Sequence, residues 1–162
     1  MERLEDDSAQ ESRRPAPTVR PWTPNSKRTI LAARMVPEPR LDEEEQRLFD
    51  KGVAEFNGGA YFECHDTLEE LWTGLRGPGR DFFQGLIQVS VAFYHLSGGN
   101  LPGADSMFAR ALKRFEAYPP RYFGFDLAAQ RAEIERWRQR IGQGEVEAGP
   151  GELPRWPWSQ DR

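Results

Sequence analysis

Apolar residues recur at steps of three and four over residues 42–141, which predicts helices and not strands. Breaks rich in glycine or proline, such as Asn57-Gly58-Gly59 and Pro119-Pro120, divide this stretch, because these residues favour helix ends and chain reversals. The predicted helices span about residues 42–56, 60–75, 79–97, 100–117 and 127–141. The pattern therefore predicts an all-α fold, a compact bundle of about five helices.

The two ends of the chain lack this pattern. Residues 1–40 are rich in proline and poor in core-forming residues, which is typical of a disordered arm, with Ser26–Val36 as its one helical candidate. Residues 142–162 form a loose tail rich in glycine and proline, in which Trp156-Pro157-Trp158 is unusual. Docking of these tryptophans against the domain or a neighbour, or a free tail, are the two alternatives. The predicted domain is the helical bundle of residues 41–141.

The helix predicted over residues 79–97 is apolar almost all round, which is typical of the centre of a bundle. Its polar exceptions, Gln84, Gln88 and His95, follow one line along it. A buried glutamine without a partner costs about 1–3 kcal/mol, so we expect a polar group opposite this line.

The candidate for that polar group is on the preceding helix, where the spacing predicts that His65 faces the core. Glu69 follows His65 by four residues, a rotation of roughly 40°, so the two side chains can share one ligand or one hydrogen-bonded network. Asp66 and Trp72 adjoin this line and are further candidates for ligand binding. We therefore predict a buried polar site formed by His65, Glu69, Gln84, Gln88 and His95.

Each of these residues also has a structural interpretation. His65 with Glu69 is either a base or metal ligand oriented by a carboxylate, or a core histidine whose ring nitrogen the carboxylate satisfies. The glutamines either orient a substrate or join helices by hydrogen bonds, and His95 near a helix C-terminus is either catalytic or a cap. Cys64 has no lysine or arginine close in sequence, so a small buried residue is favoured over a nucleophile.

His65, Glu69 and His95 together supply three nitrogen or oxygen ligands, enough for a catalytic zinc or iron with an open position. The candidate cofactor is therefore a divalent metal, and the same three residues are the catalytic candidates. The helices lack the Glu-x-x-His steps of di-iron bundles, and the chain has no His-Glu-x-x-His string, phosphate loop or nucleophile elbow.

Composition narrows the partners and the location. Lysine plus arginine total 22 against 26 aspartate plus glutamate, a net charge of -4, so we expect no nucleic-acid partner. The first residues do not resemble a secretion signal, and no apolar run of about 18 residues occurs, so we expect no membrane association. A single cysteine agrees with a reducing compartment, and we expect a cytoplasmic protein.

Several short motifs across about residues 45–127 resemble the bacterial and plastid family called domain of unknown function 309. They are Phe56-Asn57, Tyr61-Phe62-Glu63-Cys64-His65-Asp66, Leu68-Glu69-Glu70-Leu71-Trp72, Phe83-Gln84-Gly85-Leu86-Ile87-Gln88, Tyr94-His95-Leu96, Gly99-Asn100 and Gly103-Ala104. The resemblance implies a helical bundle and brings no established activity. Asp66 stands where the family usually has a glutamate, and its shorter side chain reaches less far toward a ligand.

Two classes of function remain open. The first is a binding module, either for a small-molecule ligand or for a protein partner, including a homodimer formed through aromatic residues. The second is a metal-assisted hydrolase in which His65 is the base or ligand and Glu69 orients it, while the substrate is bound by Gln84, Gln88 and His95. The binding module is favoured because no complete catalytic set can be named.

Overall fold

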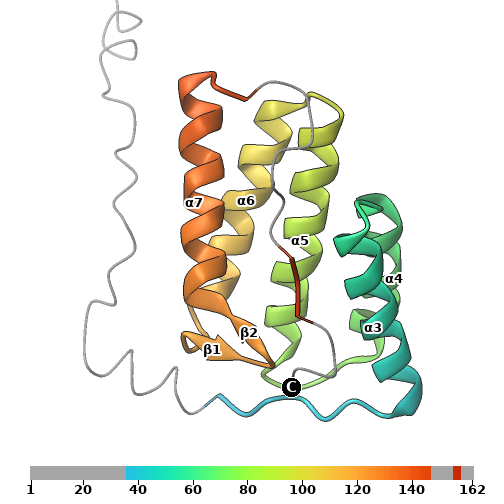
Figure 1. The fold of residues 1–162 in the computed structure, drawn as a ribbon. Helices are drawn as coiled ribbons and strands as arrows, with labels where there is room; N and C mark the ends of the chain where they lie inside the picture. The colour runs from blue at the N-terminus through green and yellow to red at the C-terminus, as the bar shows by residue number, and fades with distance from the viewer. Residues whose placement is uncertain (1–35, 147–154, 158–162) are drawn as a thin grey trace, which may run out of the picture.

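In a computed structural model of the chain, the residues described are 36–146 and 155–157. They form five helices and one short hairpin (Figure 1). The elements are α3 (Glu43–Asn57), α4 (Tyr61–Gly74), α5 (Arg80–Ser97), α6 (Leu101–Phe115), β1 (Arg121–Tyr122), β2 (Phe125–Asp126) and α7 (Leu127–Gln143). The predicted all-α bundle is confirmed, while all but the last residue of the candidate helix Ser26–Val36 lies outside the described part.

Side-chain caps fix where three of the helices begin. Asp42 accepts a hydrogen bond from the Glu45 backbone, and the Glu45 side chain accepts one from the Asp42 backbone, so α3 begins with a capping box. Asn100 caps α6 and Asp126 caps α7, each with a side-chain oxygen that accepts one backbone N–H and without the reciprocal bond of a capping box. Local sequence therefore sets these boundaries before tertiary packing contributes.

Helix α5 is the centre of the bundle, with α4 against one side and α6 against the other (Figure 1). Its phenylalanines Phe82, Phe83 and Phe93 are at most 1% exposed. Gly85 lets α6 approach closely, because a Cβ atom at this position would lie 2.5 Å from Cε1 of Phe115. No helix within the described ranges is both long and apolar enough to cross a membrane.

The segment before α3 packs against the β1–β2 hairpin. The Tyr122 hydroxyl donates to the Pro37 carbonyl at 2.7 Å, and the Glu38 carboxylate accepts from the Phe123 backbone at 2.7 Å. The Pro39 ring packs closely on the backbone of Gly79, since a Cβ atom added at Gly79 would lie 2.8 Å from Cδ of Pro39. The sequence pattern predicted that residues 36–40 belong to the disordered arm. Single contacts made by prolines and backbone carbonyls leave no periodic pattern that could have shown this packing.

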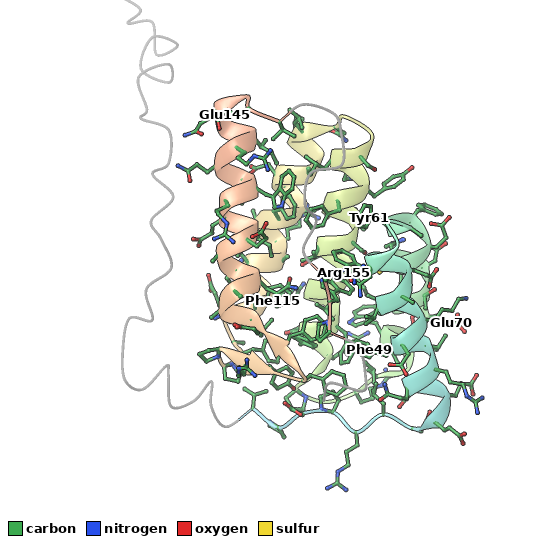
Figure 2. The ribbon with its side chains drawn as sticks, in the orientation of Figure 1. Phe49, Tyr61, Glu70, Phe115, Glu145 and Arg155 are labelled. Carbon is green, nitrogen blue, oxygen red and sulfur yellow. The ribbon has the colours of Figure 1, made fainter. Side chains whose placement is uncertain are left out.

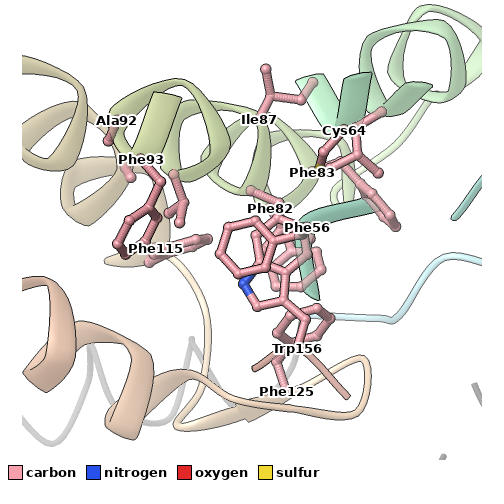
Figure 3. Close-up of a cluster of buried hydrophobic side chains, with 14 of the residues drawn as sticks. Phe56, Cys64, Phe82, Phe83, Ile87, Ala92, Phe93, Phe115, Phe125 and Trp156 are labelled. Carbon is pink, nitrogen blue, oxygen red and sulfur yellow. The ribbon is translucent and has the colours of Figure 1, made fainter. Parts of the chain in front are cut away.

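One residue of the C-terminal tail is part of the core. Trp156 is 1% exposed and stacks on Phe56 at the end of α3, with ring centroids 3.7 Å apart (Figure 3). Of the two alternatives for the tail tryptophans, docking therefore holds for Trp156, and Trp158 lies outside the described residues.

Candidate functional site

Every residue of the predicted site lies on α4 or α5. His65, Asp66, Glu69 and Trp72 lie on α4, and the two glutamines and His95 lie on α5. Two contacts across the seam between these helices show that they run antiparallel. The Arg80 guanidinium lies 3.6 Å from the Trp72 ring centroid at one end, and the Phe62 and Tyr94 rings are 5.5 Å apart at the other. This register brings Gln88 level with His65.

The site lies at the surface, so the prediction of a buried site was wrong. The His65 side chain is 27% exposed, and those of Asp66 and Glu69 are 62% and 54% exposed. Gln84, Gln88 and His95 are half-buried. The α4 residues that face the core are Tyr61, Cys64, Thr67, Leu68 and Leu71. His65 lies beside this line because Cys64, one residue earlier, takes the buried position.

The imidazole of His65 lies between two carboxylates. Its Nδ1 atom is 3.2 Å from Oδ1 of Asp66, and its Nε2 atom is 3.3 Å from Oε2 of Glu69. One ligand atom from each of the three side chains can be chosen so that all lie within 4.8 Å of one another. Over the described ranges, no other group of three His, Cys, Asp or Glu side chains is arranged closely enough to hold a metal ion.

The distance between Nε2 of His65 and Oε2 of Glu69 fits two ligands of one ion. Nitrogen and oxygen ligands lie about 2.0–2.2 Å from a zinc-like ion, so neighbouring ligands in a tetrahedral site are about 3.3–3.6 Å apart. The observed 3.3 Å falls within this range. Asp66, at the other ring nitrogen, is placed to accept a hydrogen bond from Nδ1, as carboxylates do behind metal-bound histidines. The donor set therefore fits a divalent metal.

His95 lies apart from this cluster and contacts the start of α6. Its Nδ1 atom is 3.2 Å from the Asn100 side-chain amide, while the Asn100 backbone donates to the His95 carbonyl at 2.8 Å. Asn100 also caps α6 through Gly103. This arrangement matches the capping interpretation of His95. The structure thus does not bring together the predicted trio of His65, Glu69 and His95.

Two of the three remaining candidates, Gln88 and Trp72, have buried polar atoms without a hydrogen-bond partner. The Gln88 side-chain oxygen is buried without a hydrogen-bond partner, so it accepts no bond from Gln84. The Trp72 indole nitrogen is also buried without a partner, and its ring is covered by Arg80. Gln88 therefore has an unused acceptor oxygen inside the packing and not on the solvent-exposed side of the cluster, whereas Trp72 mainly packs against the bundle.

Sequence reasoning missed an aromatic patch, which we define as Phe62 and Tyr94. Phe62 is 51% exposed and Tyr94 is 47% exposed, and their rings contact each other across the seam. The Phe62 ring also lies 6.0 Å from His65, and the Tyr94 ring 6.0 Å from His95. The only sign of the patch in the sequence is that Phe62 and Tyr94 fall outside the rows of residues that α4 and α5 bury. The patch therefore joins the two histidines along the surface.

The outer face of α4 is acidic. Glu63, Asp66, Glu69 and Glu70 are all exposed, and α4 has no lysine or arginine. Glu70 points away from the bundle (Figure 2). The field of this face attracts cations and basic groups, because acidic side chains without nearby basic partners add their potentials.

Fold and site together define a helical-bundle protein with a histidine–carboxylate cluster on the seam of two adjacent helices. Residues 49–107 match the model of the family described as "Domain of unknown function (DUF309)", so this part of the chain is similar to that family and the resemblance is confirmed. The matched span contains the whole α4–α5 seam.

Two curated relatives are similar to parts of the chain. "Uncharacterized protein YpuF" of Bacillus subtilis (strain 168) is 38% identical over 58 residues, which is 35% of this chain and 33% of the relative. An "Uncharacterized protein" of Aquifex aeolicus (strain VF5) is 26% identical over 110 residues, 67% of this chain and 32% of the relative. The chain therefore spans about a third of the length of the curated relatives it matches. Their names assign no activity, so a functional proposal has to start from the geometry.

Proposed function

We propose that the protein is a small-ligand-binding module that uses a divalent metal ion held by His65 and Glu69. The observation that supports this is the 3.3 Å distance between Nε2 of His65 and Oε2 of Glu69, which suits two ligands of one ion. An imidazole together with a carboxylate suits zinc, manganese and similar divalent ions. Because the Glu69 carboxylate is about half exposed, the other coordination positions face solvent and can take water or an oxygen of a small ligand.

Asp66 and the acidic face of α4 have supporting roles in this proposal. In this proposal the Nδ1–H group of His65 donates a hydrogen bond to the Asp66 carboxylate, which leaves the lone pair of Nε2 free for the metal. The acidic α4 face raises the local concentration of cations around the cluster.

Equilibrium dialysis and titration calorimetry of the untagged protein with Zn²⁺ and Mn²⁺ test the proposal. We expect one saturable site that is lost in His65→Ala and weakened about tenfold or more in Glu69→Gln, since one of few ligands is removed. Glu70→Gln is the matched control, because it removes the same charge from the neighbouring exposed residue. The proposal fails if the wild type shows no saturable binding, or if Glu70→Gln weakens binding as much as Glu69→Gln.

The metal-assisted hydrolase is a finer version of this proposal. A bound metal would supply Lewis-acid activation of water, and His65 and Glu69 would hold it. His95 is engaged by Asn100, so a direct catalytic role for it would require that contact to break. Turnover of ester or phosphodiester substrates that depends on both the metal and His65 would support the hydrolase hypothesis. Metal binding without turnover would support the binding module alone.

The aromatic patch favours a protein partner as the second candidate function. Phe62 and Tyr94 are the two large hydrophobic side chains most exposed among the described residues, and they lie beside the acidic face. A partner with an apolar residue among basic groups would match both features, whereas a homodimer through this patch would bring two acidic faces together. Sedimentation at several salt concentrations tests the homodimer, because screening would strengthen it. A Phe62→Ser, Tyr94→Ser variant that self-associates equally would exclude the patch as the interface.

A further inference from the structure

The last described residues of the chain fill a socket built by a distant part of it. We define the socket as Phe56, Asn57 and Phe125, at the end of α3 and in the hairpin. The Trp156 indole stacks on the Phe56 ring with an interplanar angle of 6°, and it meets the Phe125 ring at 71° with centroids 5.9 Å apart (Figure 3). This geometry fits a flat aromatic side chain.

Asn57 binds the main chain of the docked residue and not its side chain. Its Nδ2 atom donates to the Trp156 carbonyl at 2.9 Å, and its Oδ1 atom accepts from the Trp156 N–H at 2.7 Å. Proteins that bind extended peptides divide recognition in this way, with main-chain hydrogen bonds for affinity and a side-chain pocket for specificity. Pro157 assists, because a residue before proline is restricted to extended conformations.

The socket and its occupant belong to different parts of the chain. Phe56 and Asn57 lie within the span that matches the family, and Trp156 lies outside it. Residues 147–154 connect the occupant to the bundle. A linker of this length gives an effective concentration on the order of millimolar, so the tail can fill the socket even when its own affinity is weak.

We propose that the socket is a peptide-binding site for an extended Trp-Pro segment, and that residues 155–157 are its intramolecular occupant. The same segment supplied as a separate peptide exchanges with the tethered one. The indole provides the specificity, and the two hydrogen bonds from Asn57 fix the direction of the peptide.

The test uses the full chain with a protease recognition sequence in place of residues 148–151, cleaved after folding. A labelled peptide of residues 152–162 should then bind saturably, and the uncleaved chain should bind it at least about tenfold more weakly because its socket is filled. The peptide with Trp156→Ala should not bind, whereas the size-matched peptide with Trp158→Ala should. Asn57→Ala in the cleaved chain should weaken binding about tenfold, as expected for losing two neutral hydrogen bonds.

A second route avoids cleavage. The full chain with Trp156→Ala has an empty socket, and the wild-type peptide should bind it and raise its melting temperature. The proposal is overturned if both folded proteins fail to bind the peptide at about 1 mM, a concentration comparable with that of the tethered tail. It is also overturned if the two alanine peptides lose binding equally, since the indole of Trp156 would then not be what the socket recognises.

Discussion

Replacing Trp156 by alanine tests whether the end of the chain contributes to the stability of a bundle formed far from it in sequence. A tryptophan buries about 150–250 Å², which at about 25 cal/mol per Å² corresponds to about 4–6 kcal/mol before any offset. The offset is conformational entropy, because the tail is released and regains about 1–2 kcal/mol for each residue it had ordered. Three docked residues regain about 3–6 kcal/mol, while the two hydrogen bonds to Asn57 that are lost with them cost about 1–3 kcal/mol, so we expect a net loss of about 1–3 kcal/mol.

Trp137 provides the matched control. It is 3% exposed, and its indole nitrogen, like that of Trp156, is buried without a partner. Trp137 belongs to α7 and cannot leave the core while the helix remains, so Trp137→Ala should cost the full amount of about 3–5 kcal/mol. The expected order is therefore a smaller loss for Trp156→Ala than for Trp137→Ala.

Urea titrations followed by circular dichroism at 222 nm give both free energies of unfolding. Asn57→Ala should destabilise by about 1–2 kcal/mol, since both of its hydrogen bonds go to Trp156. In the Trp156→Ala background the same change should cost much less, because the partner has already left. The reasoning is refuted if Trp156→Ala changes stability by less than about 0.5 kcal/mol, or if the two changes are additive.

Three further outcomes follow from the described contacts. His65→Ala should change the free energy of unfolding by less than about 1 kcal/mol in a urea titration, since its carboxylate partners are exposed; a loss above about 2 kcal/mol would show a structural network. Burial, and to a smaller extent the nearby Glu55, raise the pKa of the Cys64 thiol. Cys64 in the native protein should therefore react with a thiol reagent only as fast as the protein opens locally. Rapid labelling of Cys64 in the folded protein would contradict the burial of the thiol. Burial raises the pKa of Tyr61 from 10.0 to about 12, so the contribution of the neutral phenol to stability is complete below pH 10 and is lost as pH rises through about 12. An absorbance titration of phenolate should therefore show ionisation coupled to unfolding. Ionisation of the buried tyrosines near pH 10 with the fold intact would count against this.

The helices could be predicted because their signals are local. The predicted start of the first helix at Asp42 agrees with its capping box, and the break at Asn57-Gly58-Gly59 separates α3 from α4 as expected. The apolar period extends over many residues in each helix, so an error at one position changes little. The bundle therefore follows from the pattern alone.

The face of α4 that is buried could not be decided in this way. A line through Tyr61, Cys64, Leu68 and Leu71 and a line through Tyr61, His65, Leu68 and Trp72 both advance by three- and four-residue steps. Packing against α3 and α5 selects the first line, and this contact is tertiary. The pairing of His65 with Asp66 was also unpredictable from spacing, because adjacent helical residues point about 100° apart and do not normally face each other.

Trp156 shows a different limit. A single aromatic residue in a glycine- and proline-rich tail has no period, and its burial depends on a complementary surface 99 positions earlier in the chain. Only the unusual presence of tryptophans in such a tail indicated docking. Long-range complementarity of this kind becomes visible only when the helices are placed in space.

The order of packing in the bundle has a consequence for how the chain folds. The main helix contacts join neighbours in sequence, α3 with α4, α4 with α5, α5 with α6 and α6 with α7 (Figure 1). Contacts of this kind close only short loops, and chains rich in them fold in microseconds to milliseconds. Docking of Trp156 closes a far longer loop and brings little surface until Phe56 and Phe125 are in place. Helix formation should therefore be complete before the amide of Trp156 becomes protected from hydrogen exchange, and that amide should be among the first to exchange when the native protein opens.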